Sequence, residues 1–164
     1  MNAAVATHID FKAMTGIFEQ AARKGRDILY EHEVYNLLRN LGSETPPRTL
    51  LLLAGTRPTD EELMALPGDR VVLKIVSPAI VHKSDVGGVR IIPKNPDKIR
   101  STWRRMMYEV AENYADRIER RPGHAPARYQ GLSGDALVSA ISQDIEGVLL
   151  VQFVPPDATT FGNE

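Results

Sequence analysis

The sequence predicts an α+β (mixed α/β) domain in which packed helices accompany a central β-hairpin. Apolar residues recur at helical spacing in several segments, and short apolar runs of strand length stand between them. Two such runs lie at the two ends of residues 71–93 and are joined by a polar loop that closes with Gly87 and Gly88, as in a hairpin. Helical segments separate the other runs. A chain that joins strands both by a hairpin and by helical crossovers is typical of this fold class.

The composition is that of an ordinary globular protein. Its 164 residues are 43% hydrophobic and 25% charged, and the formal net charge of −1 indicates neither a nucleic-acid nor a membrane partner. The absence of cysteine excludes disulfides, thiolate metal ligands and cysteine nucleophiles. The N-terminal residues lack the pattern of a signal peptide, and no apolar stretch has the length of a membrane span. We therefore expect a cytoplasmic protein.

Two helices are predicted in the first quarter of the chain. Asp10 is a suitable N-cap for the first helix, which we expect to end near Gly25. The second carries apolar residues on one face between Tyr30 and Leu41 and should stop at Gly42, because glycine readily adopts the left-handed conformation that ends a helix.

A strand and a short helix lead into the hairpin. The run Thr49–Ala54 has the length and apolar character of a buried strand. Thr59 is a candidate cap for a short helix that extends through Leu66. Pro67, Gly68 and Asp69 follow as a turn, because this composition favours chain reversal.

The second half of the chain is predicted to contain a long helix, a loop and a strand. Asn95 and Pro96 form a good helix start, and the apolar stripe continues to about Arg120. Residues 121–134 are rich in glycine and proline, which predicts an exposed or disordered loop. The most apolar run, 148–154, should be a central strand.

Lys74 is the unusual residue of the hairpin. It lies between Val72 and Val76 on one face of the first strand, where a lysine either extends to water or meets an anion. Glycines such as Gly87 and Gly88 let backbone N–H groups approach phosphate closely. We therefore expect the hairpin to hold the phosphates of a nucleotide. The alternatives are that Lys74 is an edge-strand lysine and that the two glycines form a β-bulge.

Three segments resemble the nucleotide-binding part of NDP-forming acyl-CoA synthetases, the ATP-grasp enzymes that include ADP-forming acetyl-CoA synthetase. They are Glu31–Gly42 (EHEVYNLLRNLG), Val72–Val89 (VLKIVSPAIVHKSDVGGV) and Glu146–Val154 (EGVLLVQFV), and the second is the most specific. The resemblance extends over residues 29–154. It implies that 29–164 form the first lobe of an ATP-grasp domain, truncated before the second lobe, and that 1–28 form an N-terminal helical extension.

The resemblance also implies roles for individual residues. His82 would relay a phosphoryl group, and neutral imidazole is a competent nucleophile near pH 7. Asp85 would either orient that ring or be a solvated turn residue. Lys74 would contact phosphate. Ser84 would either form the turn or meet a phosphate through its hydroxyl. The other nucleotide-binding residues would lie in the flap over the phosphates, beside the adenine and at the ribose, namely Gly87 and Gly88, then Gln152, Phe153 and Val154, and finally Glu164.

The reaction implied is the conversion of acid, CoA and ATP to acyl-CoA, ADP and phosphate. ATP and Mg²⁺ would be the cofactors, with no metal ligand within this chain and the Mg²⁺ ligands beyond residue 164. The partner would be a CoA-binding domain or subunit of the same enzyme, and the chain alone should be inactive. Two alternatives stay open, a non-catalytic nucleotide-sensing or assembly module and a structural α/β interaction domain. The first predicts that the full gene product lacks acidic Mg²⁺ ligands downstream.

Overall fold

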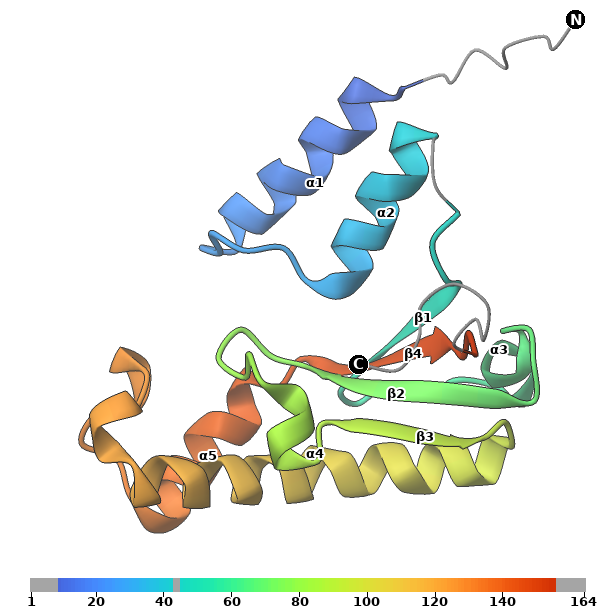
Figure 1. Cartoon of the computed structure of the whole chain (residues 1–164). Helices are drawn as coiled ribbons and strands as arrows, with labels where there is room; N and C mark the ends of the chain where they lie inside the picture. Colours follow the sequence, from blue (N-terminus) through green and yellow to red (C-terminus); the bar gives the residue numbers. More distant parts are fainter. Residues whose placement is uncertain (1–8, 43–44, 156–164) are drawn as a thin grey trace, which may run out of the picture.

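The computed structural model describes residues 9–42 and 45–155, and these form one four-stranded antiparallel sheet with helices on both faces (Figure 1). The strands are β1 (Thr49–Leu53), β2 (Arg70–Val76), β3 (Val89–Pro93) and β4 (Gly147–Gln152). The helices are α1 (Phe11–Arg23), α2 (Glu31–Leu41), α3 (Asp60–Met64), α4 (Pro96–Arg120) and α5 (Gly134–Asp144). Short 3₁₀ turns occupy η1 (Lys83–Val86), Pro122–His124 and Ala127–Tyr129. The predicted α+β class is confirmed.

The strand order is β1-β4-β2-β3, so the hairpin forms one side of the sheet and β4 is an inner strand, as predicted. In the register of β2, Lys74 lies opposite Val89 of β3 and Leu149 of β4. The prediction of a buried strand for residues 49–54 was wrong in one respect. β1 is an edge strand, and Leu53 is 43% exposed, because only β4 pairs with it.

The two faces of the sheet pack against different helices. Val71, Leu73 and Ile75 of β2 point into the main core, which they share with α4 and α5. Val76, and in part Val72, belong to a smaller cluster on the opposite face, where Tyr30 at the start of α2 joins them. In Figure 1, α4 and α5 lie below the sheet, whereas α1 and α2 lie above it. Lys74 alternates with the residues of the main core, so its side chain is on the α2 face.

Local chemistry fixes most helix ends. The Asp10 carboxylate accepts a hydrogen bond from the Ala13 N–H at 2.9 Å, and the Asn95 side chain accepts one from the Lys98 N–H at 2.9 Å. Gly42 ends α2 with φ 69°, a left-handed angle that favours glycine. Among the described residues, no helix is both long and apolar enough to cross a membrane.

The segment 121–134 agrees with the first of its two predicted alternatives, an exposed loop. Most of its residues are exposed, but it is a structured connection rather than a disordered one. Tyr129 is 2% exposed, its hydroxyl donates to Asp144 Oδ2 at 2.7 Å, and its ring meets that of Tyr114 edge-on with 6.3 Å between centroids. The glycines and prolines indicated a loop correctly, yet one aromatic side chain anchors that loop to α4 and α5.

Candidate functional site

Three of the predicted site residues line one small cavity on the α2 side of the hairpin. Lys74, His82 and Ser84 share this space of about 300 Å³, which we call the His82 cavity. Lys83 brings a second ammonium group to it, and its other lining residues are Glu31, Val81, Asp85 and Val89. Two lysines, an imidazole and a hydroxyl can together bind an anion and accept a transferred group.

The loop that carries His82 is held by α4. Asn113 donates to the Val86 carbonyl at 3.1 Å, and the Tyr114 hydroxyl donates to the Ala79 carbonyl at 2.9 Å. One bond precedes η1 and the other reaches its last residue, so the polar loop has a fixed position against the second half of α4. Sequence reasoning missed both residues, since the stripe of α4 was assigned to core packing alone.

Lys74 forms an ion pair in this structure. Its Nζ lies 2.5 Å from Glu31 Oε1, and the two side chains are 26% and 27% exposed. Because β2 is an inner strand, the edge-strand alternative for Lys74 is wrong. Tyr35 also donates to Glu31 Oε1 at 2.7 Å, and burial together with this hydrogen bond raises the pKa of Tyr35 to about 12. Any anion that binds Lys74 therefore competes with a carboxylate already in place.

The start of α2 is anchored so that Glu31 faces the sheet. Arg26 binds both oxygens of Glu33, at 2.9 and 2.6 Å, and the Glu33 carboxylate also accepts the Tyr30 N–H at 2.7 Å. The Arg26 guanidinium lies 4.0 Å from the centroid of the Tyr30 ring. The Tyr30 hydroxyl donates to Glu146 Oε1 at 2.7 Å, just before β4. These contacts join α2 to the central strand.

His82 lies between two cavities. It is exposed, precedes η1 and lines the His82 cavity on one side. On the other side it lines a space of about 430 Å³ together with Tyr114, Arg117, Arg121 and His124. The imidazole is therefore accessible from two directions, and the second cavity is also lined by basic residues.

Asp85 pairs with α4 rather than with the imidazole. Arg117 Nη1 lies 2.5 Å from Asp85 Oδ2, and this hydrogen bond holds the pKa of the Asp85 carboxyl below its usual range. The Asp85 N–H donates to the His82 carbonyl at 3.3 Å, but among the described residues no side-chain hydrogen bond joins the Asp85 carboxylate to the imidazole. Of the two roles open for Asp85, the geometry favours a turn residue that ties η1 to α4.

The two glycines after η1 are constrained differently. Gly87 has φ 72°, in the left-handed region, and its N–H donates to the Ser84 carbonyl at 3.3 Å. Gly88 donates to the Lys83 carbonyl at 2.7 Å and accepts from the Ile75 N–H at 2.8 Å. A Cβ on Gly88 would lie 2.8 Å from that same carbonyl oxygen. Both N–H groups thus already bond within the protein.

The predicted adenine-contacting residues lie away from the cavity. Gln152 is opposite Val71, three residues before Lys74 and so about 10 Å along the strand. Phe153 follows, with the Arg70 guanidinium 4.5 Å from its ring centroid, and Val154 is 58% exposed. The structure does not bring these residues together with Lys74 and His82. Glu164 lies outside the described residues.

The described residues do not fit a metal ion. Residues 9–42 and 45–155 contain no cluster of three or more histidine, aspartate or glutamate side chains able to hold one. Mg²⁺ prefers several oxygen ligands in octahedral geometry. No catalytic step through Mg²⁺ is therefore assigned to these residues.

Comparisons with known proteins identify a family and several relatives for this chain. A family model described as an ATP-grasp domain matches residues 20–121. Subunit beta of ADP-forming acetate–CoA ligase I from Pyrococcus furiosus is 36% identical over 101 residues, which is 60% of this chain. The ADP-forming 4-hydroxybutyrate–CoA ligase of Nitrosopumilus maritimus is 30% identical over 103 residues, 63% of this chain. The crystal structure of PH1788 from Pyrococcus horikoshii covers 88% of the chain with 26% identity and a TM-score of 0.53.

The chain spans less than half of the length of each of these three known proteins. The chain covers 40% of the Pyrococcus subunit, 14% of the Nitrosopumilus ligase and 49% of PH1788. The family match includes α2, the hairpin and all of α4, which contain Lys74, His82 and the residues that position them. The chain belongs to the ATP-grasp domain family.

Proposed function

We propose that this chain is the nucleotide-binding part of an ADP-forming acyl-CoA ligase and that His82 relays the phosphoryl group. The observation that carries the proposal is that Lys74, His82 and Ser84 line one cavity at the end of the hairpin. The named relatives, ligases that form ADP, supply the reaction class.

The proposed chemistry at His82 is a displacement at the γ-phosphorus of ATP. The unprotonated imidazole nitrogen forms the P–N bond while the bond to the bridging oxygen of ADP breaks, and ADP departs with the electron pair. Lys74 and Lys83 neutralise charge on the phosphates, and the Ser84 hydroxyl donates to them. The phosphoryl group then passes to the acid in a CoA-binding domain or subunit. A histidine accessible from two cavities suits such a relay.

The other predicted residues have supporting roles in this proposal. Gly87 and Gly88 close the turn that holds Ser84 at the phosphates, and a side chain at Gly88 would overlap the Lys83 carbonyl oxygen. Gln152, Phe153 and Val154 would border the adenine at the far end of the strand, and Glu164, which lies outside the described residues, would bind the ribose. Mg²⁺, when bound, would neutralise phosphate charge, and the described residues contain no cluster of side chains to hold it.

Glu31 provides a sharp test because it competes for Lys74. If Lys74 binds phosphate, Lys74→Ala should weaken ATP binding about ten-fold or more, as expected for loss of a charge-assisted hydrogen bond. Glu31→Gln should strengthen ATP binding, because it removes the carboxylate that now holds the ammonium group. Titration of the 164-residue chain with ATP, followed by ¹H–¹⁵N NMR spectra, measures both affinities and shows which amides respond.

The two variants together separate the proposal from a structural role. An ion pair that only supports the fold predicts that both substitutions lower stability and that neither changes ATP binding. Lys98→Ala is the matched control, since this exposed lysine lies in α4 outside the lining of the His82 cavity. Equal affinity in Lys74→Ala, Lys98→Ala and the unmodified chain removes Lys74 from the site and favours the structural α/β module.

A further inference from the structure

A second, larger cavity lies on the α4 side of the sheet. It has a volume of about 880 Å³ and is bounded by the loop after β1 and by the first half of α4. We call it the Arg57–Arg104 groove, and it is lined by Ala54, Gly55, Thr56, Arg57, Pro58, Arg100, Trp103, Arg104, Met107 and Tyr108. It shares no lining residue with the His82 cavity.

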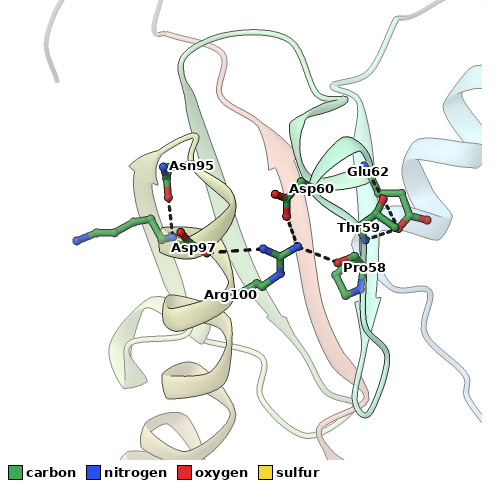
Figure 2. Close-up of polar contacts among 8 residues, drawn as sticks. Pro58, Thr59, Asp60, Glu62, Asn95, Asp97 and Arg100 are labelled. Atoms are coloured by element: carbon green, nitrogen blue, oxygen red, sulfur yellow. Dashed lines mark hydrogen bonds and ion pairs between the residues drawn. The ribbon is translucent and has the colours of Figure 1, made fainter.

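One part of the groove wall is Arg100, which is held in place by a hydrogen bond and ion pairs. Arg100 donates to the Pro58 carbonyl at 3.1 Å, pairs with Asp60 and lies 3.8 Å from Asp97 (Figure 2). These contacts attach the start of α3 to α4, and Figure 2 shows the guanidinium between the two. They also balance the charge of Arg100 and hold the loop that carries Arg57 in position.

At two further arginines of the groove, Arg57 and Arg104, the positive charge is not balanced by an ion pair among the described residues. Among the ion pairs of residues 9–42 and 45–155, neither Arg57 nor Arg104 has a carboxylate partner. Both are exposed, and no acidic residue lines the groove. The unbalanced positive charge at this concave surface therefore favours an anion.

The rest of the wall is apolar and aromatic. Tyr108 is 72% exposed, Met107 is half-buried, and Trp103 is 8% exposed. The Nε1 atom of Trp103 is buried and has no hydrogen-bond partner among the described residues. A buried indole N–H normally finds an acceptor, so Trp103 has an unsatisfied donor behind this apolar surface.

We propose that the Arg57–Arg104 groove binds a small organic anion with a planar apolar body. Arg57 and Arg104 hold the carboxylate, phosphate or sulfonate group, and the apolar body lies against Met107 and Tyr108. The volume is in the range of small-molecule sites, which are mainly apolar with a few placed polar groups. The site is separate from the proposed nucleotide site and does not depend on it.

Trp103 gives a direct readout because it is the only tryptophan in the chain. The experiment titrates the 164-residue chain with phenyl phosphate and follows Trp103 fluorescence. Inorganic phosphate has only the anionic group and benzyl alcohol has only the aromatic ring. They therefore serve as comparison ligands. Phenyl phosphate should give a saturable change in Trp103 fluorescence. The concentration needed should be several-fold lower than for inorganic phosphate or benzyl alcohol.

Substitutions at the groove complete the test. Arg57→Ala and Arg104→Ala should each weaken phenyl phosphate binding about ten-fold. Arg105→Ala is the matched control, because Arg105 is exposed on the same helix but does not line the groove, and it should leave binding unchanged. Circular dichroism and thermal unfolding check that each variant is folded.

Three outcomes would overturn the proposal. The first is unchanged affinity in both groove variants. The second is binding of inorganic phosphate as tight as that of phenyl phosphate, which indicates bare charge attraction. The third is loss of the signal in Lys74→Ala but not in Arg104→Ala, which assigns the ligand to the His82 cavity. That last result would leave the proposed nucleotide site intact.

Discussion

At the scale of single residues, the most buried ion pair among the described residues is between Arg26 and Glu33. Their side chains are only 6% and 12% exposed, and the carboxylate accepts both guanidinium hydrogen bonds and the Tyr30 N–H. Removing one partner of a buried ion pair leaves the other charge without compensation, which costs far more than the loss of an exposed pair. Glu33 therefore contributes to the position of α2, and through it to that of Glu31.

Glu33→Gln should lower the free energy of unfolding by about 2 to 4 kcal/mol, because Arg26 then remains buried without a carboxylate. Urea denaturation measures the change. Glu19→Gln is the control: its pair with Arg23 is exposed, at 58% and 77%, and should contribute less than about 1 kcal/mol. Equal effects of the two substitutions would contradict the assignment.

The same contact predicts a dependence on pH. Burial opposes the ionisation of Glu33, but the hydrogen bonds from Arg26 and the Tyr30 N–H outweigh it, so the pKa of Glu33 lies below its ordinary value. A depressed pKa stabilises the fold above the unfolded value of about 4.3, and this stabilisation is lost as the pH falls through the folded value. Glu33→Gln should therefore flatten the stability profile below about pH 4.3.

At the scale of secondary-structure elements, the pairing of β1 with β4 depends on one glycine. Gly147 begins β4 opposite Leu53 of β1 and Val76 of β2. A Cβ at this position would lie 2.1 Å from the Leu52 carbonyl oxygen and 2.9 Å from the Leu53 Cα. These are backbone atoms, so the overlap can be relieved only by moving the edge strand.

Gly147→Ala should destabilise the chain by about 3 kcal/mol and speed amide hydrogen exchange in β1 more than in β3. Gly16→Ala is a control of opposite sign. Gly16 is in the middle of α1 with nothing within 4 Å of a built Cβ, so alanine there should stabilise by about 0.5 to 1 kcal/mol. A small effect at Gly147, or exchange spread evenly over the sheet, would count against this account.

An element could be predicted from the sequence when the interactions that form it join residues close together in the chain. Asp10 and Asn95 cap helices through bonds three residues away, and such local chemistry is readable from the sequence. The edge position of β1 follows from pairing with a strand about a hundred residues later, which no local pattern encodes. The burial of Tyr129 was missed for the same reason, because its partners belong to α4 and α5.

The contrast between local and long-range interactions also explains what could be predicted of the candidate site. The hairpin and its Lys74 were predicted from alternation within one segment, and the cavity that joins Lys74, His82 and Ser84 agrees with that interpretation. Glu31 was missed as the partner of Lys74, since the two are 43 residues apart and meet only when α2 packs on the sheet. An ion pair between elements requires the tertiary arrangement.

At the scale of the whole molecule, α4 joins the two proposed sites. Its first half lines the Arg57–Arg104 groove, and its second half holds the loop that carries His82 through Asn113 and Tyr114. In the proposed function Lys74 and His82 would provide one side of a nucleotide site, and the described residues contain no cluster of metal ligands. Phosphoryl transfer depends on aligned reactants and on neutralised phosphate charge, and in the proposed function part of that neutralisation would come from Mg²⁺, for which the described residues contain no ligand cluster.

We therefore expect the 164-residue chain to bind ATP without turning it over. Mixed with acetate, CoA and Mg-ATP, it should release ADP at least about a thousand-fold more slowly than the roughly 10 s⁻¹ typical of enzymes. Chromatographic separation of ADP and acetyl-CoA over several hours measures both products, and His82→Ala identifies background hydrolysis. Steady acetyl-CoA formation that disappears in His82→Ala would mean that the chain is catalytically sufficient. ADP release equal in both forms would come from a contaminant, because the proposed relay requires the imidazole.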